Sequence, residues 1–482
     1  MSTRLTWINA LHVLFYFCGI KIVTRVLSYL YKRAFNQHRQ QSYMTDWIGE
    51  TFTSNIGWKH LERLVDIDIR MAGSGGERHA AEVTRDALTD VGARNAHLEE
   101  FEIQGWARES AAIHAGDTAQ DCIALPRSPS GNVMGELVDI GHGLPTDFDC
   151  DLNEKVILAA SDIPDWHDRY VHRREKYYRA VNAGASAFIY RNHVNGCLPP
   201  TGSVGTEEAP IGEIPAVGVS KEVGKRLSRR FTGDDVVVNT HVDIYDTTSQ
   251  NIHADLGPKT ENAVFLTSHV DAHDIGEGAA DNAAGTAIVL EVARALAQRE
   301  SELDTRVHLL VYGAEEIGLV GSQYDADSRD HETIKAIVNN DGVVRNRTLV
   351  CHAHGFDDLI DAADRVAARM DHPIDVPPEL NPHSDHWPYV TWGVPGYHIR
   401  ADTGDVGRGW GHTHADTLDK LSVRDLREQA ILLTELVIEL ASDDTTVAHR
   451  PPSAIADQLE RENRAEGMQV IGDWPYTKTI DR

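Results

Sequence analysis

Several side chains that could bind a metal ion follow apolar stretches in the second half of the chain. The stretches 263–268, 307–312 and 334–338 are short and apolar, as expected for buried strands. Each is followed by histidine or carboxylate side chains, and a further histidine stands in a loop before the last predicted helix. The residues concerned are His269, Asp271, Asp281, Glu315, Glu316, Asp341 and His412. Because ligands of open α/β sheets bind at the carboxyl ends of the strands, these side chains are expected to meet at one edge.

The chemistry that fits this set is that of a two-metal hydrolase. Massed carboxylates repel one another unless a cation lies among them. Two histidines with three carboxylates suit Zn²⁺, and such a set also tolerates Co²⁺ or Mn²⁺. A two-metal hydrolase needs one bridging carboxylate and two further ligands per ion, with the ions about 3.5–4 Å apart. The five cysteines are scattered and contain no Cys-x-x-Cys pair, so they predict neither a disulfide scaffold nor a thiolate metal site.

The elements that must position these residues divide the chain into different kinds of structure. From residue 246 to 445 strands alternate with helices, ending in a helix predicted at 423–441. This alternation predicts an α/β domain with a mostly parallel, mixed sheet sandwiched by helices, and residues 44–103 are expected to be its first part. Residues 104–245 form a separate block of short β-like runs without a catalytic constellation. The polar residues 446–482 are expected to form an extended tail.

The segments around the candidate ligands resemble the motifs of the co-catalytic two-zinc aminopeptidase family. This family includes bacterial leucyl aminopeptidase, aminopeptidase Y and glutamate carboxypeptidase II. Five segments carry the resemblance and stand in the family's order: 268–285, 312–322, 339–342, 384–386 and 412–418. The resemblance covers about residues 50–445 and implies a zinc exopeptidase fold that acts on peptides.

The block 104–245 resembles the protease-associated domain, a β-rich insert found in several peptidase families. The resemblance rests on three segments: Lys-Val-Ile-Leu-Ala at 155–159, Ala-Gly-Ala-Ser-Ala-Phe-Ile-Tyr at 183–190 and Ile-Pro-Ala-Val-Gly-Val-Ser-Lys-Glu at 214–222. The chain is therefore expected to be an exopeptidase with an inserted protease-associated domain.

The family resemblance also implies a role for each residue of the candidate site. Two Zn²⁺ ions per chain would be bound by His269, Asp281, Glu316, Asp341 and His412. Family geometry pairs His269 with Asp341 and Glu316 with His412, while Asp281 bridges both ions. Glu315 would be the general base. Asp271 would orient the His269 imidazole through a contact behind it.

An aminopeptidase is the favoured function, and a carboxypeptidase of the glutamate carboxypeptidase type is the closest alternative. A carboxypeptidase must hold a substrate carboxylate, and Arg400 or Arg408 could do so. However, Gly411 precedes His412, where glutamate carboxypeptidase II has a tyrosine, and this departure favours an aminopeptidase. Glutaminyl cyclase, a single-zinc acyltransferase, and a non-catalytic protein like the transferrin receptor are more remote alternatives. The complete ligand set and the retained base disfavour both.

Other residues near the motifs are expected to have supporting roles. His273 and His414 are predicted to be solvated neighbours of the true ligands. Asp385 is predicted to support the site, whereas His386 fits a substrate-side and a structural role equally well. Three aromatic residues nearby are expected to pack rather than line the pocket: Trp387, Tyr389 and Trp392.

The charge balance excludes some functions. The chain has 74 acidic and 46 basic residues, a formal net charge of -28. Such a surface argues against non-specific binding of nucleic acid or anionic membranes. The composition resembles that of proteins from salt-loving archaea, because strong self-repulsion needs screening by salt. A halophilic protein is therefore expected.

Residues 1–43 differ from the rest of the chain. They contain six basic and no acidic residues, and the apolar run 7–20 is shorter than the roughly 20 residues of a spanning helix. The segment fits a signal peptide poorly, because no small-residue cleavage site follows the apolar run. A membrane anchor and a start at Met44, with an upstream extension, remain open, and the change of composition favours the latter. Both place the enzyme in the cytoplasm, and only the signal peptide exports it.

Overall fold

The computed structural model describes residues 46–206, 209–404 and 409–478, in two compact units, 1–53 and 54–482. Of the first unit only residues 46–53 are described, and they form a helix. The predictions made for residues 1–43 lie outside the described residues. Within the described part of the chain, no helix is both long and apolar enough to span a membrane.

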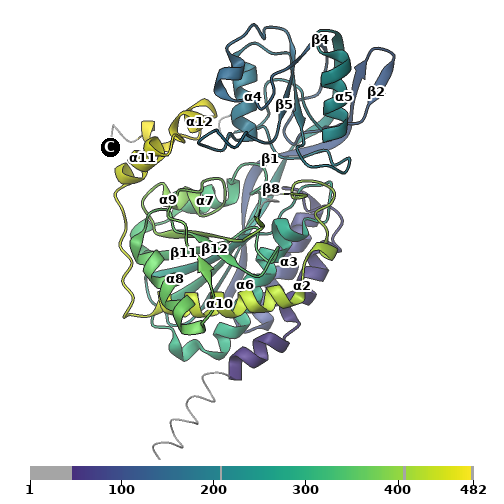
Figure 1. Cartoon of the computed structure of the whole chain (residues 1–482). Coiled ribbons are helices and arrows are strands. Elements are labelled where there is room, and N and C mark those ends of the chain that lie inside the picture. Colours follow the sequence, from purple (N-terminus) through teal and green to yellow (C-terminus); the bar gives the residue numbers. More distant parts are fainter. Residues whose placement is uncertain (1–45, 207–208, 405–408, 479–482) are drawn as a thin grey trace, which may run out of the picture. The chain divides into compact units, whose positions relative to one another are not determined.

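The second unit contains the mixed, mostly parallel sheet that the sequence predicts (Figure 1). Its catalytic part comprises, in spatial order, β13 (Ile374–Asp375), β12 (Leu349–His352), β14 (Gly396–Ala401), β11 (Ile334–Asn340), β9 (Ala263–His269), β10 (Arg306–Tyr312) and β8 (Asp235–Leu256). The four strands β14, β11, β9 and β10 are parallel to their neighbours in this group. The flanking strands β12 and β8 run antiparallel to β14 and β10. The carboxyl ends of the four parallel strands therefore share one edge.

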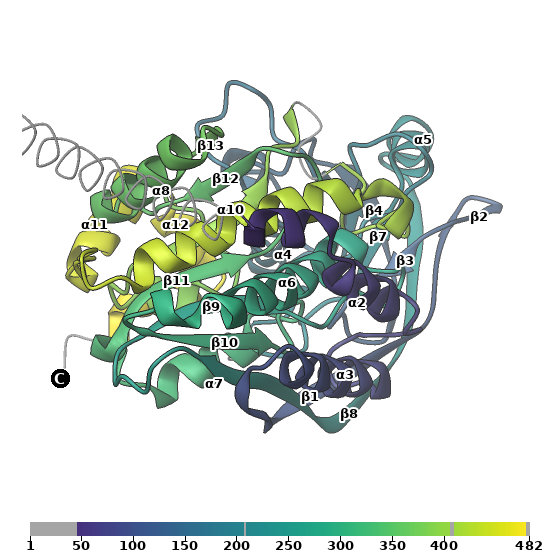
Figure 2. The same ribbon diagram turned by 90° about the horizontal axis from the view of Figure 1, so that it is seen from below.

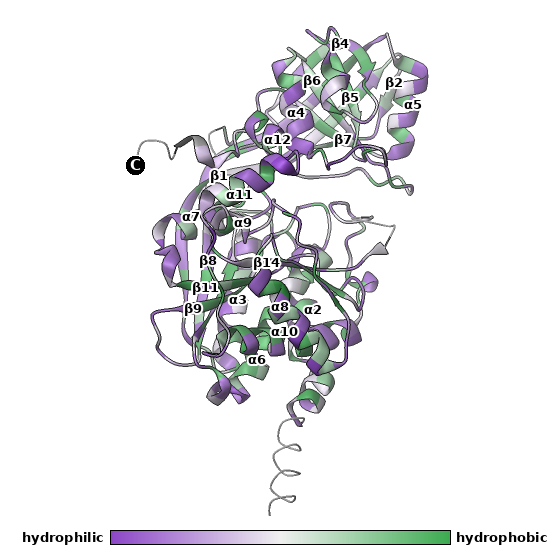
Figure 3. Ribbon diagram, turned by 60° about the vertical axis from the view of Figure 1, so that its left-hand side comes forward, coloured by the Kyte–Doolittle hydropathy of each residue, from purple (hydrophilic) through white to green (hydrophobic). Residues whose placement is uncertain are grey.

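Helices cover both faces of this sheet. The larger apolar core lies under α2 (Ile56–Val65), α3 (Gly75–Asp90), α6 (Ala284–Gln298), α8 (Asp357–Met370) and α10 (Val423–Ala441) (Figure 2). A smaller core on the other face includes residues of α7 (Val320–Ser328) and α9 (Trp387–Val390). Strand β9 serves both cores, because Val264 and Leu266 face the first while Ala263 and Phe265 face the second. Figure 3 shows apolar stretches in α6 and α10, the helices next to the sheet.

A long antiparallel ribbon connects the catalytic sheet to the insert. Strands β1 (Arg94–Ala115) and β8 are each 22 residues long and pair along most of their length. Residues 252–256 of β8 pair with β10, whereas residues 235–240 pair with β4 of the insert. The strand predicted at 97–103 is thus only part of β1, because its pairing with β8 continues past Gly105 into the insert.

The insert has its own short sheet with a helix on each face. Its strands are β4 (Gly131–Asp139), β5 (Val156–Ala160), β6 (Ala187–Arg191), β7 (Ala216–Val219) and β3 (Ile123–Ala124). Strands β4 to β7 are parallel. Helices α4 (Arg173–Asn182) and α5 (Lys221–Phe231) contribute residues to separate apolar clusters on the two faces. Strand β2 (Thr118–Gln120) extends the ribbon by pairing with β1.

The tail beyond residue 446 is folded, so the prediction of an extended appendage is wrong. It contains α11 (Pro452–Arg461) and α12 (Ala465–Val470). Leu459 and Met468 are buried in the larger core, and the carboxylate of Asp473 forms an ion pair with Arg174 of the insert. These apolar positions are too few and too closely spaced to show a clear helical period in the sequence. The shorter helices of the unit are η1 (Pro145–Phe148), η2 (Ala279–Ala283), η3 (Glu300–Glu302), η4 (His331–Thr333), η6 (Leu418–Lys420) and η7 (Pro475–Lys478).

Candidate metal centre

The ends of three adjacent parallel strands place candidate ligands side by side. His269 is the last residue of β9, and Asp341 follows the last residue of β11. Glu315 and Glu316 come shortly after β10. Because β9 lies between β10 and β11, its histidine faces the carboxylates of both neighbours. The Nε2 atom of His269 lies 4.0 Å from carboxylate oxygens of both Glu315 and Asp341.

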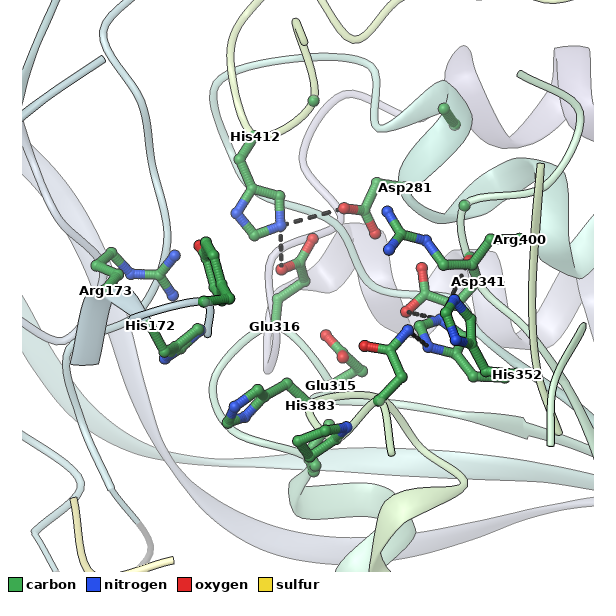
Figure 4. Close-up of a pocket in the computed structure, with 18 of the residues that line it drawn as sticks. His172, Arg173, Asp281, Glu315, Glu316, Asp341, His352, His383, Arg400 and His412 are labelled. Carbon is green, nitrogen blue, oxygen red and sulfur yellow. Dashed lines mark hydrogen bonds and ion pairs between the residues drawn. The ribbon is translucent and has the colours of Figure 1, made fainter. Parts of the chain in front are cut away.

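Asp281 lies between the two histidines of the set, which is the position of a bridging ligand. It belongs to η2, directly before helix α6. One carboxylate oxygen lies 3.4 Å from Nε2 of His269. The other lies 3.1 Å from Nε2 of His412 (Figure 4). Nε2 of His412 is also 3.3 Å from Oε2 of Glu316. The five predicted ligands therefore meet in two subsets that share Asp281.

Glu315 lies in the His269 subset. The carboxylates of Glu315 and Asp341 lie at the same distance, 4.0 Å, from Nε2 of His269. The geometry alone would therefore let Glu315 contact the same ion as Asp341. The Glu315→Gln variant distinguishes a ligand from a base, because only the loss of a ligand would lower the zinc content.

Asp271 holds the loop that carries both glutamates. Its carboxylate accepts hydrogen bonds from the backbone N–H groups of Glu315 (3.1 Å) and Glu316 (3.0 Å). The Nδ1 atom of His269 lies 3.1 Å from the Asp271 carbonyl oxygen and 3.5 Å from its carboxylate. Asp271 thus lies behind the imidazole as predicted, and it also fixes the β10 loop, which was not predicted.

Three further residues position the ligands, and sequence reasoning gave none of them a role. Asp416 accepts hydrogen bonds from the backbone N–H groups of Ala280 (2.9 Å) and Asp281 (3.1 Å). The Ser384 hydroxyl donates to the Asp341 carboxylate over 2.6 Å. The buried Arg70 guanidinium donates to four backbone carbonyl groups, those of Leu64, Val270, Glu277 and Gly278. Asp416 and Ser384 belong to motif segments, so the sequence could have indicated a role for them. Arg70 lies outside these segments, and nothing in the sequence pointed to it.

Burial and charge give the two adjacent glutamates opposite pKa shifts. Burial raises the pKa of Glu315 well above its usual value. Burial would also raise the pKa of Glu316, but the nearby imidazoles of His273 and His412 lower it below its usual value. Burial likewise raises the pKa of Asp341. So many buried acids at one place would repel one another, and cations among them would relieve this repulsion.

The donor set fits two zinc ions. Nε2 of His269 and Oε1 of Glu316 are buried and have no hydrogen-bond partner among the described residues. Buried polar atoms are normally paired, so these two atoms require another partner. Imidazole nitrogen and carboxylate oxygen are ligands that Zn²⁺ accepts in tetrahedral sites.

The loop 270–278 brings one more histidine to the site. His273 is 6% exposed, and its Nε2 lies 2.9 Å from Oε2 of Glu316. The prediction that His273 is a solvated neighbour is therefore wrong, while His414 is exposed as predicted. The cause is the tight path of this loop. At Gly278 (φ 54°) a Cβ atom would lie only 2.3 Å from that of Ala272, and Asp274 is drawn inward by Arg108, 3.0 Å away.

The other residues of the Ser-Asp-His segment are buried behind the site. Asp385 is fully buried, and burial raises its pKa to about 8. Nε2 of His386 lies 3.1 Å from Nε2 of His354 and 3.0 Å from the carbonyl oxygen of Asn381. These contacts with buried protein groups favour a structural role for His386. The three aromatic residues predicted to pack do not line the cavity into which the metal centre opens: Trp387, Tyr389 and Trp392.

The centre opens into a cavity of about 540 Å³, large enough for a small peptide. Its wall includes Arg400 of β14, while Arg408 lies outside the described residues. The insert contributes His172 and Arg173 to the same wall (Figure 4). The His172 ring stacks on His383 with centroids 4.4 Å apart. The backbone N–H of Thr201, also in the insert, donates to the carbonyl oxygen of His412 over 2.8 Å. The insert therefore helps to shape the cavity and to hold a candidate ligand.

Comparison with known proteins agrees with this geometry. Residues 251–437 match the model of peptidase family M28, and residues 133–227 match that of the PA domain. Aminopeptidase YwaD of Bacillus subtilis is 26% identical over 344 residues, which cover 67% of this chain and 70% of that protein. Leucine aminopeptidase 2 of Trichophyton equinum is 28% identical over 274 residues, 56% of this chain and 52% of its own. The chain thus spans only about half the length of this fungal relative.

Solved structures show the same fold. A peptidase M28 precursor from Shewanella amazonensis superposes with a TM-score of 0.71 at 22% identity, covering 86% of this chain and 99% of that one. The zinc aminopeptidase BSAP from Bacillus subtilis gives a TM-score of 0.64 at 22% identity, covering 82% and 98%. The family matches, the fold and the converging ligand residues together identify residues 251–437 as a domain of peptidase family M28 and residues 133–227 as a PA domain.

Proposed function

We propose that this M28 peptidase is an aminopeptidase that uses two zinc ions to remove N-terminal residues from peptides. The observation that carries the proposal is the position of Asp281, whose two carboxylate oxygens face one histidine of each ligand subset at 3.4 and 3.1 Å. A carboxylate that faces two metal positions is the central feature of a two-metal hydrolase. The names of the similar proteins, which are aminopeptidases, support the choice of substrate.

The residues of this chain have distinct tasks in the proposed reaction. His269 and Asp341 would hold one ion, Glu316 and His412 the other, and Asp281 both. The ions, when bound, would supply Lewis acidity toward the scissile carbonyl group. Glu315 would take the proton of the attacking water and pass it to the leaving amine. Asp271 keeps this glutamate in place through its backbone N–H.

A small substrate panel tests the proposal. It contains Leu-, Arg- and Glu-p-nitroanilides with free amines, their N-acetylated forms, and a dipeptide ending in glutamate, each at high salt with and without a chelator. We expect cleavage of the free-amine anilides only, lost with chelator and restored by zinc. Cleavage of only the blocked or glutamate-terminated substrates would contradict an aminopeptidase.

A carboxypeptidase is the second candidate, and the cavity wall supplies the observation that favours it. Arg400 lies in this wall close enough to Asp341 to lower the pKa of that carboxyl group, although burial raises it more. A guanidinium group beside the metal ligands could bind the terminal carboxylate of a substrate. The same panel decides between the candidates. If it favours the carboxypeptidase, Arg400→Ala is expected to raise KM for the glutamate-terminated dipeptide at least tenfold.

We also propose that the enzyme works at high salt in the cytoplasm, with no role in nucleic-acid binding. The net charge of -28 supports this, because salt screens the repulsion that destabilises so acidic a protein. Thermal unfolding in a series of KCl concentrations tests the salt requirement. A melting temperature that does not rise between about 0.1 and 2 M KCl, roughly a twentyfold range in ionic strength, would refute the salt requirement.

A further inference from the structure

His273 lies in the half of the metal centre that contains Glu316 and His412. Its Nε2 is 2.9 Å from Oε2 of Glu316, and Nε2 of His412 is 3.3 Å from that same oxygen. The ring centroids of the two histidines are 4.6 Å apart, nearly perpendicular at 86°. One donor atom from each of the three residues lies within 4.8 Å of the other two. The position predicted to be solvated thus has the geometry of a ligand.

The spacing of these atoms is that of ligands around one ion. Donor atoms that lie about 2.0–2.1 Å from a tetrahedral Zn²⁺ are separated from one another by about 3.3 Å. The relevant separations are 2.9 Å (His273 to Glu316), 3.3 Å (His412 to Glu316) and 3.1 Å (His412 to Asp281). All four residues line a small cavity of about 10 Å³, close to the space of a single water molecule or ion.

The remaining surroundings of His273 supply no other partner for its ring. Its Nδ1 is buried without a hydrogen-bond partner among the described residues, as is Oε1 of Glu316, while its Nε2 lies 2.9 Å from Oε2 of Glu316. Leaving a buried polar atom unpaired costs about 1–3 kcal/mol, so such atoms usually mark a bound ion or water. The His269 half of the centre also has a second histidine, His398, but both of its ring nitrogens have partners. Nε2 lies 3.2 Å from the carbonyl oxygen of Asp341, and Nδ1 lies 3.1 Å from the side-chain amide of Asn381.

We propose that His273 is a direct ligand of the metal ion held by Glu316, His412 and Asp281, so that the two ions of the centre are coordinated unequally. This ion has four protein ligands, the number found at closed zinc sites, whereas the ion of His269, Asp341 and Asp281 has three and keeps an open position. The four-ligand ion is therefore bound more tightly and is the last to leave on chelation. The inference rests on the proposed two-zinc function, but it concerns binding and not turnover.

The first test measures zinc bound per chain, by elemental analysis, after equilibration of the holoenzyme with chelator-buffered Zn²⁺. The wild type is expected to lose its two ions in two separate steps. His273→Ala is expected to weaken the tighter step by more than about 100-fold, beyond the 10–100-fold that a hydrogen-bonding partner of a ligand contributes. The looser step should change much less. The matched control is His414→Ala, which removes an exposed histidine near His412 and should leave both steps unchanged.

His273→Gln separates a ligand from a hydrogen-bond donor. A glutamine amide can donate to Glu316 but is a poor zinc ligand, so this variant is expected to behave like His273→Ala. Wild-type zinc affinity in His273→Gln, or a His273→Ala affinity within about 100-fold of wild type, would overturn the inference.

A crystal structure of the zinc-loaded wild type decides the question even if the variants fail to fold. Zinc at about 2.0–2.1 Å from Nε2 of His273 supports the assignment. A zinc–Nε2 distance above about 3 Å, with the imidazole hydrogen-bonded to Glu316, overturns it. A protein that binds zinc through His273 yet cleaves no free-amine substrate would refute the proposed function and leave the inference standing.

Discussion

The catalytic sheet and the sheet of the insert are both largely parallel with helices on both faces, yet their carboxyl edges differ. In the insert the polar groups at this edge pair with one another. Asp139 forms an ion pair with Arg191 over 3.2 Å, Ser161 lies 2.8 Å from Nδ1 of His193, and the Lys176 ammonium donates to the carbonyl of Ala160 over 2.7 Å. The groups at the catalytic edge face one another but remain incompletely paired. A ligand site is thus recognised by polar groups that converge without satisfying each other.

The largest effect is expected from removing the proposed base. Glu315→Gln should lower kcat by about 10²–10⁴-fold, because the amide cannot accept the proton of the attacking water. Zinc content should stay at the wild-type level, since Glu316 and the other four ligands remain. Steady-state kinetics with Leu-p-nitroanilide and elemental analysis measure both. A near-normal kcat would show that Glu315 is not the base, and loss of one zinc ion would make it a ligand.

Lys176, at the carboxyl edge of the insert sheet, is buried, so the free energy of unfolding is expected to depend on pH. Burial lowers the pKa of Lys176 to about 8 from 10.5. Between these values the unfolded chain binds more protons than the folded chain, so the free energy of unfolding should rise as pH rises from 8 to 10.5, by up to about 3 kcal/mol. Denaturant unfolding at several pH values measures this rise. In Lys176→Met it should disappear, and its persistence there would assign it to another group.

A smaller effect is expected where a carboxylate supports the metal centre without binding an ion. Asp416→Asn leaves one acceptor oxygen for the two N–H groups of Ala280 and Asp281, so zinc affinity should fall about 10–100-fold. Competition with a chelator measures the change. The control is Asp419→Asn, an exposed carboxylate close in sequence that should have no effect. Unchanged affinity in Asp416→Asn would mean that Asp281 is held by the rest of its turn.

The smallest effect on activity is expected at the paired edge of the insert. Asp139→Asn weakens the ion pair with Arg191 and should lower the free energy of unfolding by about 1–2 kcal/mol. It should leave kcat and zinc content unchanged, because Asp139 and Arg191 are not among the candidate metal ligands. Activity assays and denaturant unfolding test the two statements together. A loss of kcat would mean that the two edges are coupled.

The convergence of the candidate ligands could be predicted from the sequence because several of them follow strands. Strand and helix periods locate β9, β10 and β11, and parallel pairing then brings His269, Glu316 and Asp341 together. Features that depend on tertiary packing could not be predicted. The burial of His273 depends on how the loop 270–278 folds. Arg70 is distant in sequence from the carbonyl groups of the loop that it holds.

The other differences between the predicted and the observed structure also result from tertiary packing, here of whole strands and helices. The alternation at 97–103 marks a strand, but its true length follows from pairing with β8 over 22 residues. The helices α11 and α12 are short, and each depends on burying one or two side chains such as Leu459 and Met468 against a core formed by distant residues. Short helices are marginal on their own, so local sequence gives a weak signal for them.

The most direct test of the two-metal centre is a zinc titration of the metal-free enzyme, followed by hydrolysis of Leu-p-nitroanilide and by bound zinc per chain. We expect hydrolysis to appear only as zinc binds and to reach its maximum at two ions per chain. In Asp281→Ala, which removes the bridging carboxylate, neither two-ion binding nor hydrolysis should be recovered. Full activity in metal-free protein, or saturation at two ions by Asp281→Ala with normal turnover, would contradict the central claim.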